Sequence, residues 1–240
     1  MSSSLFNPIG ADHLWLLVPQ GVEFQRVKQG LLRRSPQTAL EINLQKIPAG
    51  GAAVMEALPQ LATQWQHSPQ GIIVMGVCGS LCPELSIGES VFLSQVQTVG
   101  SLTYQKTDPD LTQQLAARLQ AKTSQAFRTN CIGASTPSVI ATMIAKQQLA
   151  QQTQAQVVDM ENAAILDFAK TQNIPTAILR VVSDGMTGDL PDLSQAVDAQ
   201  GNLNPWALTQ AFLKQPIAAG RLIRGSLKAC HQLERLATCL

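Results

Sequence analysis

Residues 157–184 read VVDMENAAILDFAKTQNIPTAILRVVSD, and this segment gives the strongest indication of the fold class. It joins a short valine run to an alanine-rich segment with helical spacing, and then to a second apolar run. A strand, a helix and a strand in this order predict a crossover unit with parallel strands. The helix carries the chain away from Glu161, and the following strand returns it to Asp184. These two carboxylates are therefore expected at the same edge of the sheet.

The same alternation of apolar runs and helical segments extends along most of the chain. No linker-like segment or internal repeat interrupts it, so one domain over residues 1–240 is expected. The predicted fold class is α/β, with three α/β/α layers around a twisted, mostly parallel mixed sheet. Residues 185–205 are rich in turn-forming residues and are expected to form a long lid or binding loop. Further strands are predicted at 13–19, 71–81, 90–100 and 130–136. Helices are predicted at 21–34, 49–66, 109–127 and 138–153, the last with Ser138 as its cap. The chain from residue 205 onward is also predicted to be helical, with an apolar stripe of Ile223, Leu227, Cys230, Leu233 and Leu236.

The composition is that of a globular protein with a sizeable core. Hydrophobic residues make up 45% of the 240 residues, and charged residues only 14%, less than the usual quarter. A formal net charge of +1 provides no basic footprint for nucleic acid. The sequence shows no secretory signal and no apolar run of membrane-spanning length. Five unevenly spaced cysteines indicate reduced thiols in a cytoplasmic protein, and their spacing predicts no metal site.

Polar residues and glycines gather at the ends of three predicted strands, where open parallel sheets bind ligands. Residues 76–80 follow a predicted strand at 71–75, residues 159–161 follow a second at 157–158, and residues 183–185 follow a third at 176–182. Two carboxylates and a hydroxyl at one edge are typical of acid and base catalysis. The same residues also fit a structural role, in which Asp159 caps a helix and residues 183–185 form a turn. The residue pattern alone leaves both interpretations open.

Several of these segments resemble the purine nucleoside phosphorylase and nucleosidase superfamily. VVDMENAAI followed by IPTAILRVVSD is similar to that family's paired "DME" and "SD" motifs. GIIVMGVCGSLCPELSIGESVFLSQ, residues 71–95, resembles its glycine-turn segment. LWLLVPQGVEFQ, residues 14–25, resembles the strand and turn that supply an acidic residue in methylthioadenosine/S-adenosylhomocysteine nucleosidases. Residues 183–216 resemble the end of the hopanoid-associated branch.

The resemblance implies cleavage of the N-glycosidic bond of a purine nucleoside that is adenosine-like and modified at the 5′ position. Asp184 would be the acid at the purine ring, oriented by Ser183. Glu161 would hold the ribose hydroxyls, and Met160 would pack under the sugar. Glu23 would position and activate the attacking water. The glycine turn would line the substrate with Val77, Cys78 and Gly79.

One departure from the family bears on the choice between water and phosphate as the nucleophile. The positions that hold phosphate in phosphorylases are matched here by Val74 and Val77, which cannot bind an anion. Arg26 and Ser80 are the nearest substitutes. Because phosphorolysis needs a cationic or amide-rich cradle, hydrolysis is favoured.

Three alternatives to hydrolysis stay open: phosphorolysis, removal of adenine from a hopanoid, and nucleoside binding without catalysis. The expected partner is a small purine nucleoside, joined by phosphate in the phosphorolytic alternative. The resemblance implies no cofactor and no nucleic-acid partner. It also implies that the protein forms a homo-oligomer.

Overall fold

Strands and helices alternate along the computed structural model, which describes residues 14–35, 41–65, 68–101, 103–191 and 205–240. The predicted α/β class is confirmed. The strands are β1 (Leu14–Pro19), β2 (Ile42–Ile47), β3 (Gly71–Ser80), β4 (Ser90–Thr98), β5 (Tyr104–Lys106), β6 (Arg128–Ser135), β7 (Val157–Asp159) and β8 (Thr176–Asp184). The helices are α1 (Val22–Leu32), α2 (Gly51–Ala62), α3 (Pro109–Thr123), α4 (Met143–Thr153), α5 (Asn162–Thr171), α6 (Pro205–Lys214) and α7 (Pro216–Thr238).

The strands form one mixed sheet in the order β2-β1-β3-β7-β6-β4-β5. β8 pairs with both β3 and β4, so the strands β3, β7, β6, β4 and β8 close into a ring. Most pairs are parallel, as predicted. The antiparallel pairs are β3 with β7, β4 with β5 and β4 with β8. The ring brings the ends of β3, β7 and β8 together, and these are the strands that carry the polar motifs.

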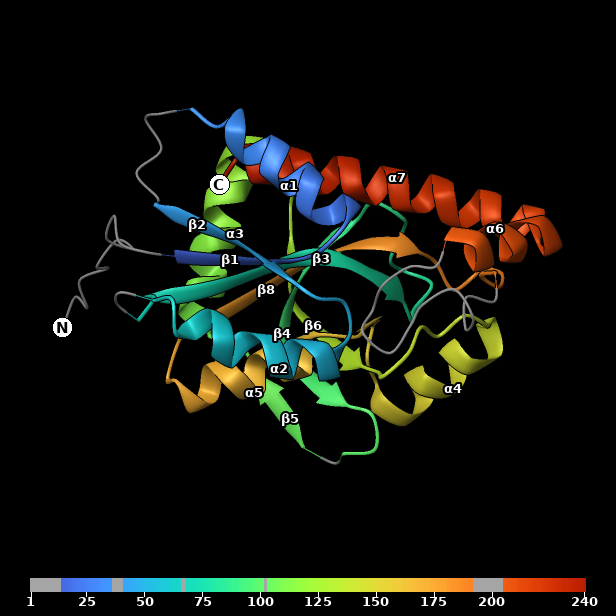
Figure 1. Ribbon diagram of the computed structural model, residues 1–240, viewed down its shortest axis with the longest axis horizontal. Coiled ribbons are helices and arrows are strands. Elements are labelled where there is room, and N and C mark those ends of the chain that lie inside the picture. Colours follow the sequence, from blue (N-terminus) through green and yellow to red (C-terminus); the bar gives the residue numbers. More distant parts are fainter. Residues whose placement is uncertain (1–13, 36–40, 66–67, 102, 192–204) are drawn as a thin grey trace.

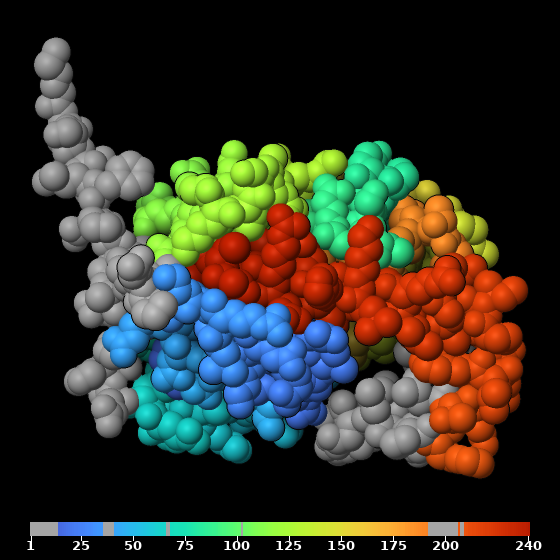
Figure 2. All heavy atoms as spheres, turned by 90° about the horizontal axis from the view of Figure 1, so that it is seen from above, coloured from blue at the N-terminus to red at the C-terminus, as the bar shows by residue number. Residues whose placement is uncertain are grey.

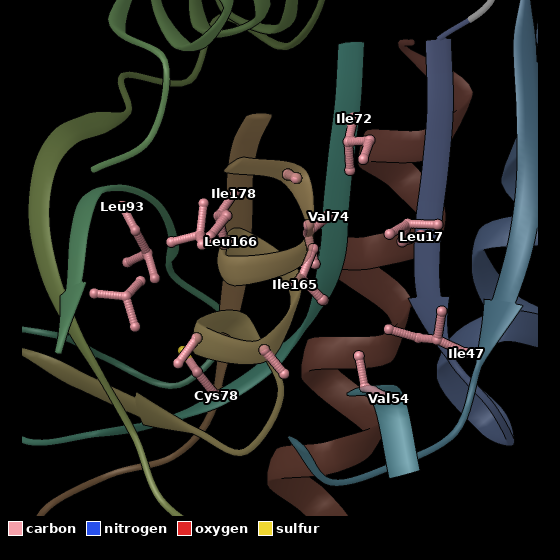
Figure 3. Close-up of a cluster of buried hydrophobic side chains, with 14 of the residues drawn as sticks. Leu17, Ile47, Val54, Ile72, Val74, Cys78, Leu93, Ile165, Leu166 and Ile178 are labelled. Atoms are coloured by element: carbon pink, nitrogen blue, oxygen red, sulfur yellow. The ribbon is translucent and has the colours of Figure 1, made fainter. Parts of the chain in front are cut away.

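Helices cover both faces of the sheet and give the three predicted layers (Figure 1). α1 and α7 lie along one face, and α2 and α5 along the other (Figure 1). Figure 2 shows α7 between α1 and α3 on the first face. In β1, Leu17 belongs to the core with α2 and α5, whereas Leu16 and Val18 belong to the core with α7. This burial on both faces explains why the central strands are continuously apolar. Figure 3 shows the first core, in which Val54 and Ile165 pack with Leu17.

Some element boundaries differ from the sequence prediction. α4 begins at Met143 rather than after Ser138, because Oγ1 of Thr142 accepts the backbone N–H of Ala145 and caps the helix. β2 was not predicted, because this edge strand mixes polar and half-buried residues. β5 has only three residues, too few to give a period.

The C-terminal part of the chain is helical as expected, but its predicted apolar stripe is only partly correct. Cys230, Leu233 and Leu236 are buried, whereas Ile223 and Leu227 are exposed.

Of the predicted loop, residues 192–204 lie outside the described residues. Among the helices that the structure describes, none has the length and apolarity to cross a membrane.

α1 packs closely against α7, and this contact fixes the position of Glu23 in the first turn of α1. A Cβ atom at Gly30 would lie 2.2 Å from the carbonyl oxygen of Glu234 and 2.8 Å from Cβ of Ala237. The Glu234 carboxylate is also held by two arginines of the α1 segment. Arg26 donates to its Oε2 at 2.9 Å, and Arg33 pairs with its Oε1.

We expect Gly30→Ala to destabilise the fold, because the new methyl group would overlap the backbone of α7. Overpacking of this kind costs about 1–3 kcal/mol of unfolding free energy, measurable by denaturant titration. Gly220→Ala in α7 is the matched control, because a Cβ atom there would meet nothing within 4 Å. That control should be neutral or stabilising. Equal destabilisation by both changes would contradict the assigned close contact.

Candidate active site

The guanidinium of Arg180 lies at the centre of a buried polar cluster. Arg180 lies in β8 opposite Gly76 of β3, and its side chain is fully buried. Nη2 donates to Oδ2 of Asp159 at 2.6 Å and to Oδ1 of Asn162 at 2.6 Å. The same nitrogen lies 3.4 Å from Oε2 of Glu161. One cation therefore ties the turn between β7 and α5 to β8.

Three carboxylates share this single buried cation. Burial alone would lower the pKa of Arg180, but Asp159, Glu161 and Glu23 together raise it above its ordinary value. Burial raises the pKa of Asp159 and the pKa of Glu161, and the positive charge of Arg180 only partly opposes this. The cluster thus contains more acid groups than one guanidinium neutralises.

Glu23 reaches the cluster from the first turn of α1. Its Oε2 accepts the backbone N–H of Val77 at 2.7 Å. Burial is the largest effect on this group and raises the pKa of Glu23 to about 7, with the charge of Arg180 acting in the opposite direction. A carboxyl group with such a pKa exchanges a proton near neutral pH, as a general base must.

Glu23 and Arg180 meet beside the backbone of Gly76. A Cβ atom at Gly76 would lie 2.8 Å from Oε2 of Glu23 and 2.1 Å from Nη1 of Arg180. Nη1 is buried and has no hydrogen-bond partner among the residues that the structure describes. A buried donor without a partner costs free energy unless water or a ligand satisfies it. The structure therefore places an N–H that needs an acceptor next to a carboxyl group of raised pKa.

Asp159 has two functions in the structure, of which the sequence predicted one. Its carboxylate accepts the backbone N–H of Asn162, the first residue of α5, at 3.3 and 3.4 Å. This is the expected capping contact. It also accepts the hydroxyl of Ser135 at 2.5 Å and pairs with Arg180. Arg180 itself was missed, although a charged residue within an otherwise apolar strand was a usable signal.

Glu161 and Met160 lie against the start of α2. Oε1 of Glu161 accepts the backbone N–H of Gly50 at 2.9 Å, and only 7% of the residue is exposed. The Met160 Cε atom lies 3.7 Å from the Cβ position of Gly50. The turn after β7 and the turn before α2 therefore face each other across these two side chains.

Asp184 ends β8, with both carboxylate oxygens in contact with donors. Oδ1 accepts the hydroxyl of Ser183 at 2.8 Å, and that hydroxyl also lies 3.2 Å from the carbonyl oxygen of Cys78. The Lys146 ammonium pairs with Oδ2 and donates to the carbonyl oxygen of Gly185 at 2.8 Å. Lys146 is almost fully buried in α4. No motif predicted Lys146, because only tertiary folding brings α4 to the end of β8.

Glu161 and Asp184 come from opposite sides of β3. In the sheet, Asp184 of β8 lies opposite Gly79 on one side of β3, and Val158 of β7 lies opposite the same glycine on the other side. The predicted parallel relation of β7 and β8 is wrong, because β7 runs antiparallel to β3 whereas β8 runs parallel to it. After Val158 the chain therefore runs back along β3, which carries Glu161 toward Arg180.

The glycine turn contributes backbone rather than side chains. The Val77 N–H binds Glu23, and the buried Cys78 offers its carbonyl oxygen to Ser183. A Cβ atom at Gly79 would lie 3.0 Å from Oδ2 of Asp184, so a side chain at this position would press on that carboxylate.

The two substitutes for a phosphate-binding residue are already engaged elsewhere. Arg26 pairs with Glu234 in the contact between α1 and α7. Ser80 is fully buried, and its hydroxyl donates to the carbonyl oxygen of Cys82 at 2.6 Å. Neither side chain is therefore directed at the cluster around Arg180.

Comparisons with known proteins identify the family of the chain and structures of similar fold. Residues 44–214 match the family described as the phosphorylase superfamily. The fold is similar to that of a Helicobacter pylori 5′-methylthioadenosine/S-adenosyl homocysteine nucleosidase, with 16% identity, a TM-score of 0.68, and coverage of 95% of this chain and 96% of the other. It also resembles the futalosine hydrolase of the same organism, with 15% identity, a TM-score of 0.61, and coverage of 90% and 97%. No match is found among curated proteins.

The α/β fold is shared with these nucleosidase and hydrolase structures. The chain belongs to the phosphorylase superfamily. The matched range contains Glu161, Arg180 and Asp184, whereas Glu23 and the whole of α7 lie outside it.

We expect Glu23→Gln to stabilise the protein more at about pH 8 than at about pH 5. In the unfolded chain the Glu23 carboxyl ionises near 4.5, and in the folded protein its pKa is about 7. Ionisation in the fold therefore costs stability as pH rises through this window, and glutamine removes that cost. Thermal unfolding midpoints at the two pH values measure the effect. Glu56→Gln, on an exposed part of α2, is the control and should leave both midpoints unchanged. An equal gain at both pH values would contradict the buried carboxyl.

Proposed function

We propose that the protein hydrolyses the N-glycosidic bond of a purine nucleoside, adenosine-like and modified at the 5′ position. The observation that carries this proposal is the convergence of Glu23 and the unpartnered Nη1 of Arg180 beside Gly76. A water molecule there would accept from Nη1 and donate to the Glu23 carboxylate. Such a water is both oriented and in contact with a base, which is what hydrolysis requires.

The reaction breaks the bond between the sugar and the base as water adds to the anomeric carbon. The water proton goes to Glu23, and the electron pair of the broken bond goes to the purine. A ring nitrogen of the leaving purine takes a proton from Asp184. The Lys146 ammonium stabilises the carboxylate that this transfer leaves, and after the base departs solvent returns a proton to Asp184 while Glu23 releases one to solvent. The overall step consumes one water and yields a free sugar and a neutral purine.

Glu161 is the residue for the ribose hydroxyls in this arrangement. Gly50 and Arg180 fix its two oxygens, and each oxygen keeps a second lone pair for a sugar hydroxyl. Met160 packs at the same turn and supplies an apolar surface for the sugar. Charge that develops on the sugar as the bond breaks would face several carboxylates, which favours an oxocarbenium-like transition state.

Water is preferred to phosphate as the nucleophile because of the charges around Gly76. A phosphate there would face Glu23, Asp159 and Glu161, and within the part of the chain that the structure describes Arg180 is the cation in contact with this cluster. Arg26 and Ser80 are bound elsewhere. The phosphorolytic alternative therefore has less support than hydrolysis.

Assembly and location complete the proposal. Large apolar side chains of α6 and α7 are exposed, among them Leu213 and Ile217, each 77% exposed. Exposed apolar residues on adjoining helices support a homo-oligomer.

All five cysteines are free thiols, which supports the predicted cytoplasmic location. The comparison with nucleosidases from methylthioadenosine metabolism supports a 5′-modified substrate.

Purified protein should release adenine from adenosine or methylthioadenosine in buffer without phosphate. Asp184→Asn should lower turnover by about 10²–10⁴-fold, the usual contribution of a general acid. Asp110→Asn, at the exposed start of α3, is the control and should retain full turnover. Chromatography of the released base measures both. Release that occurs only after phosphate is added would overturn the hydrolytic assignment.

The pH profile tests Glu23 separately. As the base, Glu23 must be ionised, so kcat/KM should rise as pH increases through about 7. Glu23→Gln should lose this rise together with most of the activity, because glutamine cannot accept the water proton. A profile in the variant that keeps the same inflection would assign the titration to another group.

A further inference from the structure

A cavity opens next to Asp184, and its wall is strongly basic. It has a volume of about 320 Å³, within the usual range for sites that bind small molecules. Arg221, Arg224 and Lys228 of α7 line it on one side. Figure 2 shows this helix beside the residues that connect β3 to β4 and those that follow β8. The other lining residues are Ile87, Asp184, Gly185, Thr187, Gly188, Leu190 and Gly225.

The three cations belong to one face of α7. Their spacing of three and four residues places them in consecutive turns, where like charges repel each other. Asp184 is the one acidic side chain on the wall among the described residues, and Lys146 already pairs with it. The described wall therefore has a surplus of positive charge that an anion would neutralise.

Two of these cations are held in position by the surrounding backbone. Nη2 of Arg221 donates to the carbonyl oxygen of Asp189 at 2.7 Å. Its guanidinium carbon lies 2.9 Å from the Cβ position of Gly188, so a side chain at that position would displace the guanidinium. The Lys228 side chain packs in the same way on Gly88, with Cε 2.8 Å from the Cβ position. The basic wall is thus prearranged, which lowers the entropic cost of binding a ligand.

α7 is fixed to the end of β8 by a close backbone contact. A Cβ atom at Gly225 would lie 2.0 Å from the carbonyl oxygen of Ser183, the residue before Asp184. No larger side chain fits between the helix and the strand. The basic wall and the Asp184 carboxylate therefore keep a fixed relation to each other.

We propose that this cavity is an anion-binding subsite that receives a carboxylate attached to the base of the substrate. This inference rests on the proposed function, in which Asp184 contacts the leaving purine. A group bound in the cavity then lies next to the purine base and away from the water beside Gly76. The nucleophile attacks the anomeric carbon from the face opposite the leaving base, so a phosphate bound in this cavity is not placed to attack. The favoured substrate class is a purine nucleoside with an acidic substituent on its base.

Binding of two adenine derivatives tests the subsite independently of turnover. One derivative carries a carboxymethyl group on the exocyclic nitrogen, and the other carries the corresponding neutral amide. By calorimetry, the native protein should bind the acid at least tenfold more tightly than the amide. An Arg224→Gln, Lys228→Gln double variant should lose this preference. Arg235→Gln, exposed on the same helix, is the matched control and should keep it. Equal affinity for acid and amide, or a preference that survives in the double variant, would overturn the subsite.

Assays with the two corresponding nucleosides separate the subsite from the proposed function. Preferred hydrolysis of the acid form is expected, and Arg235→Gln should retain that preference. Cleavage of both forms at equal rates would reject the subsite while leaving the nucleosidase proposal standing. Tight, α7-dependent binding of the acid without cleavage of any nucleoside would retain the subsite and reject the nucleosidase. A last assay measures base release with and without inorganic phosphate. Release that depends on phosphate, and on Arg224 and Lys228, would identify phosphate as the anion and overturn the carboxylate assignment.

Discussion

The buried guanidinium of Arg180 is the interaction on which the rest of the site depends. Its Nη2 atom contacts Asp159, Asn162 and Glu161. The negative charge of Glu23 also raises the pKa of this guanidinium. Burying one cation with several carboxylates is costly, and apolar residues of similar volume often stabilise a core better. Stability alone therefore gives little reason for the cluster, whereas the proposed reaction gives each of its charges a role.

The closed ring of strands is what allows that cluster to form. β8 runs parallel to β3 and β7 runs antiparallel to it, so the chain passes Gly79 from both sides. This arrangement sends Asp184 beyond the end of β3 and sends Glu161 back toward Gly76. The acid proposed for the base and the group proposed for the sugar are thereby separated along the strand. Because Gly76 has no side chain, the Arg180 guanidinium and the Glu23 carboxylate can both approach its backbone.

The distribution of charge around Asp184 differs from that around Arg180. Acidic groups outnumber the single cation near Gly76, whereas basic groups dominate the cavity lined by α7. Asp184 lies between these two regions and has Lys146 as its direct partner. A neutral water beside Gly76 and an acidic substituent beside α7 are the ligands that such an arrangement favours. In the proposed function, these two regions would divide attack and recognition between opposite sides of the leaving group.

Much of the fold and part of the site could be predicted from the sequence. The βαβ-like order around residues 157–184 was predictable because apolar runs and helical spacing are local properties. Thr142 rather than Ser138 caps α4, because capping depends on which hydroxyl reaches a free backbone N–H in the folded turn. β2 escaped prediction because an edge strand needs little apolar alternation.

The layered α/β fold, and Glu23, Glu161 and Asp184 as candidate acid groups, could be inferred from the amino-acid sequence. Those features follow from periodicity and from motifs in which the informative residues are neighbours. Only the tertiary structure decided that Arg180 would gather the carboxylates and that Lys146 would face Asp184. It also decided that the cations of α7 would line a cavity at the same carboxylate. These contacts join residues far apart in the chain, and their distances depend on how the strands close and the helices pack.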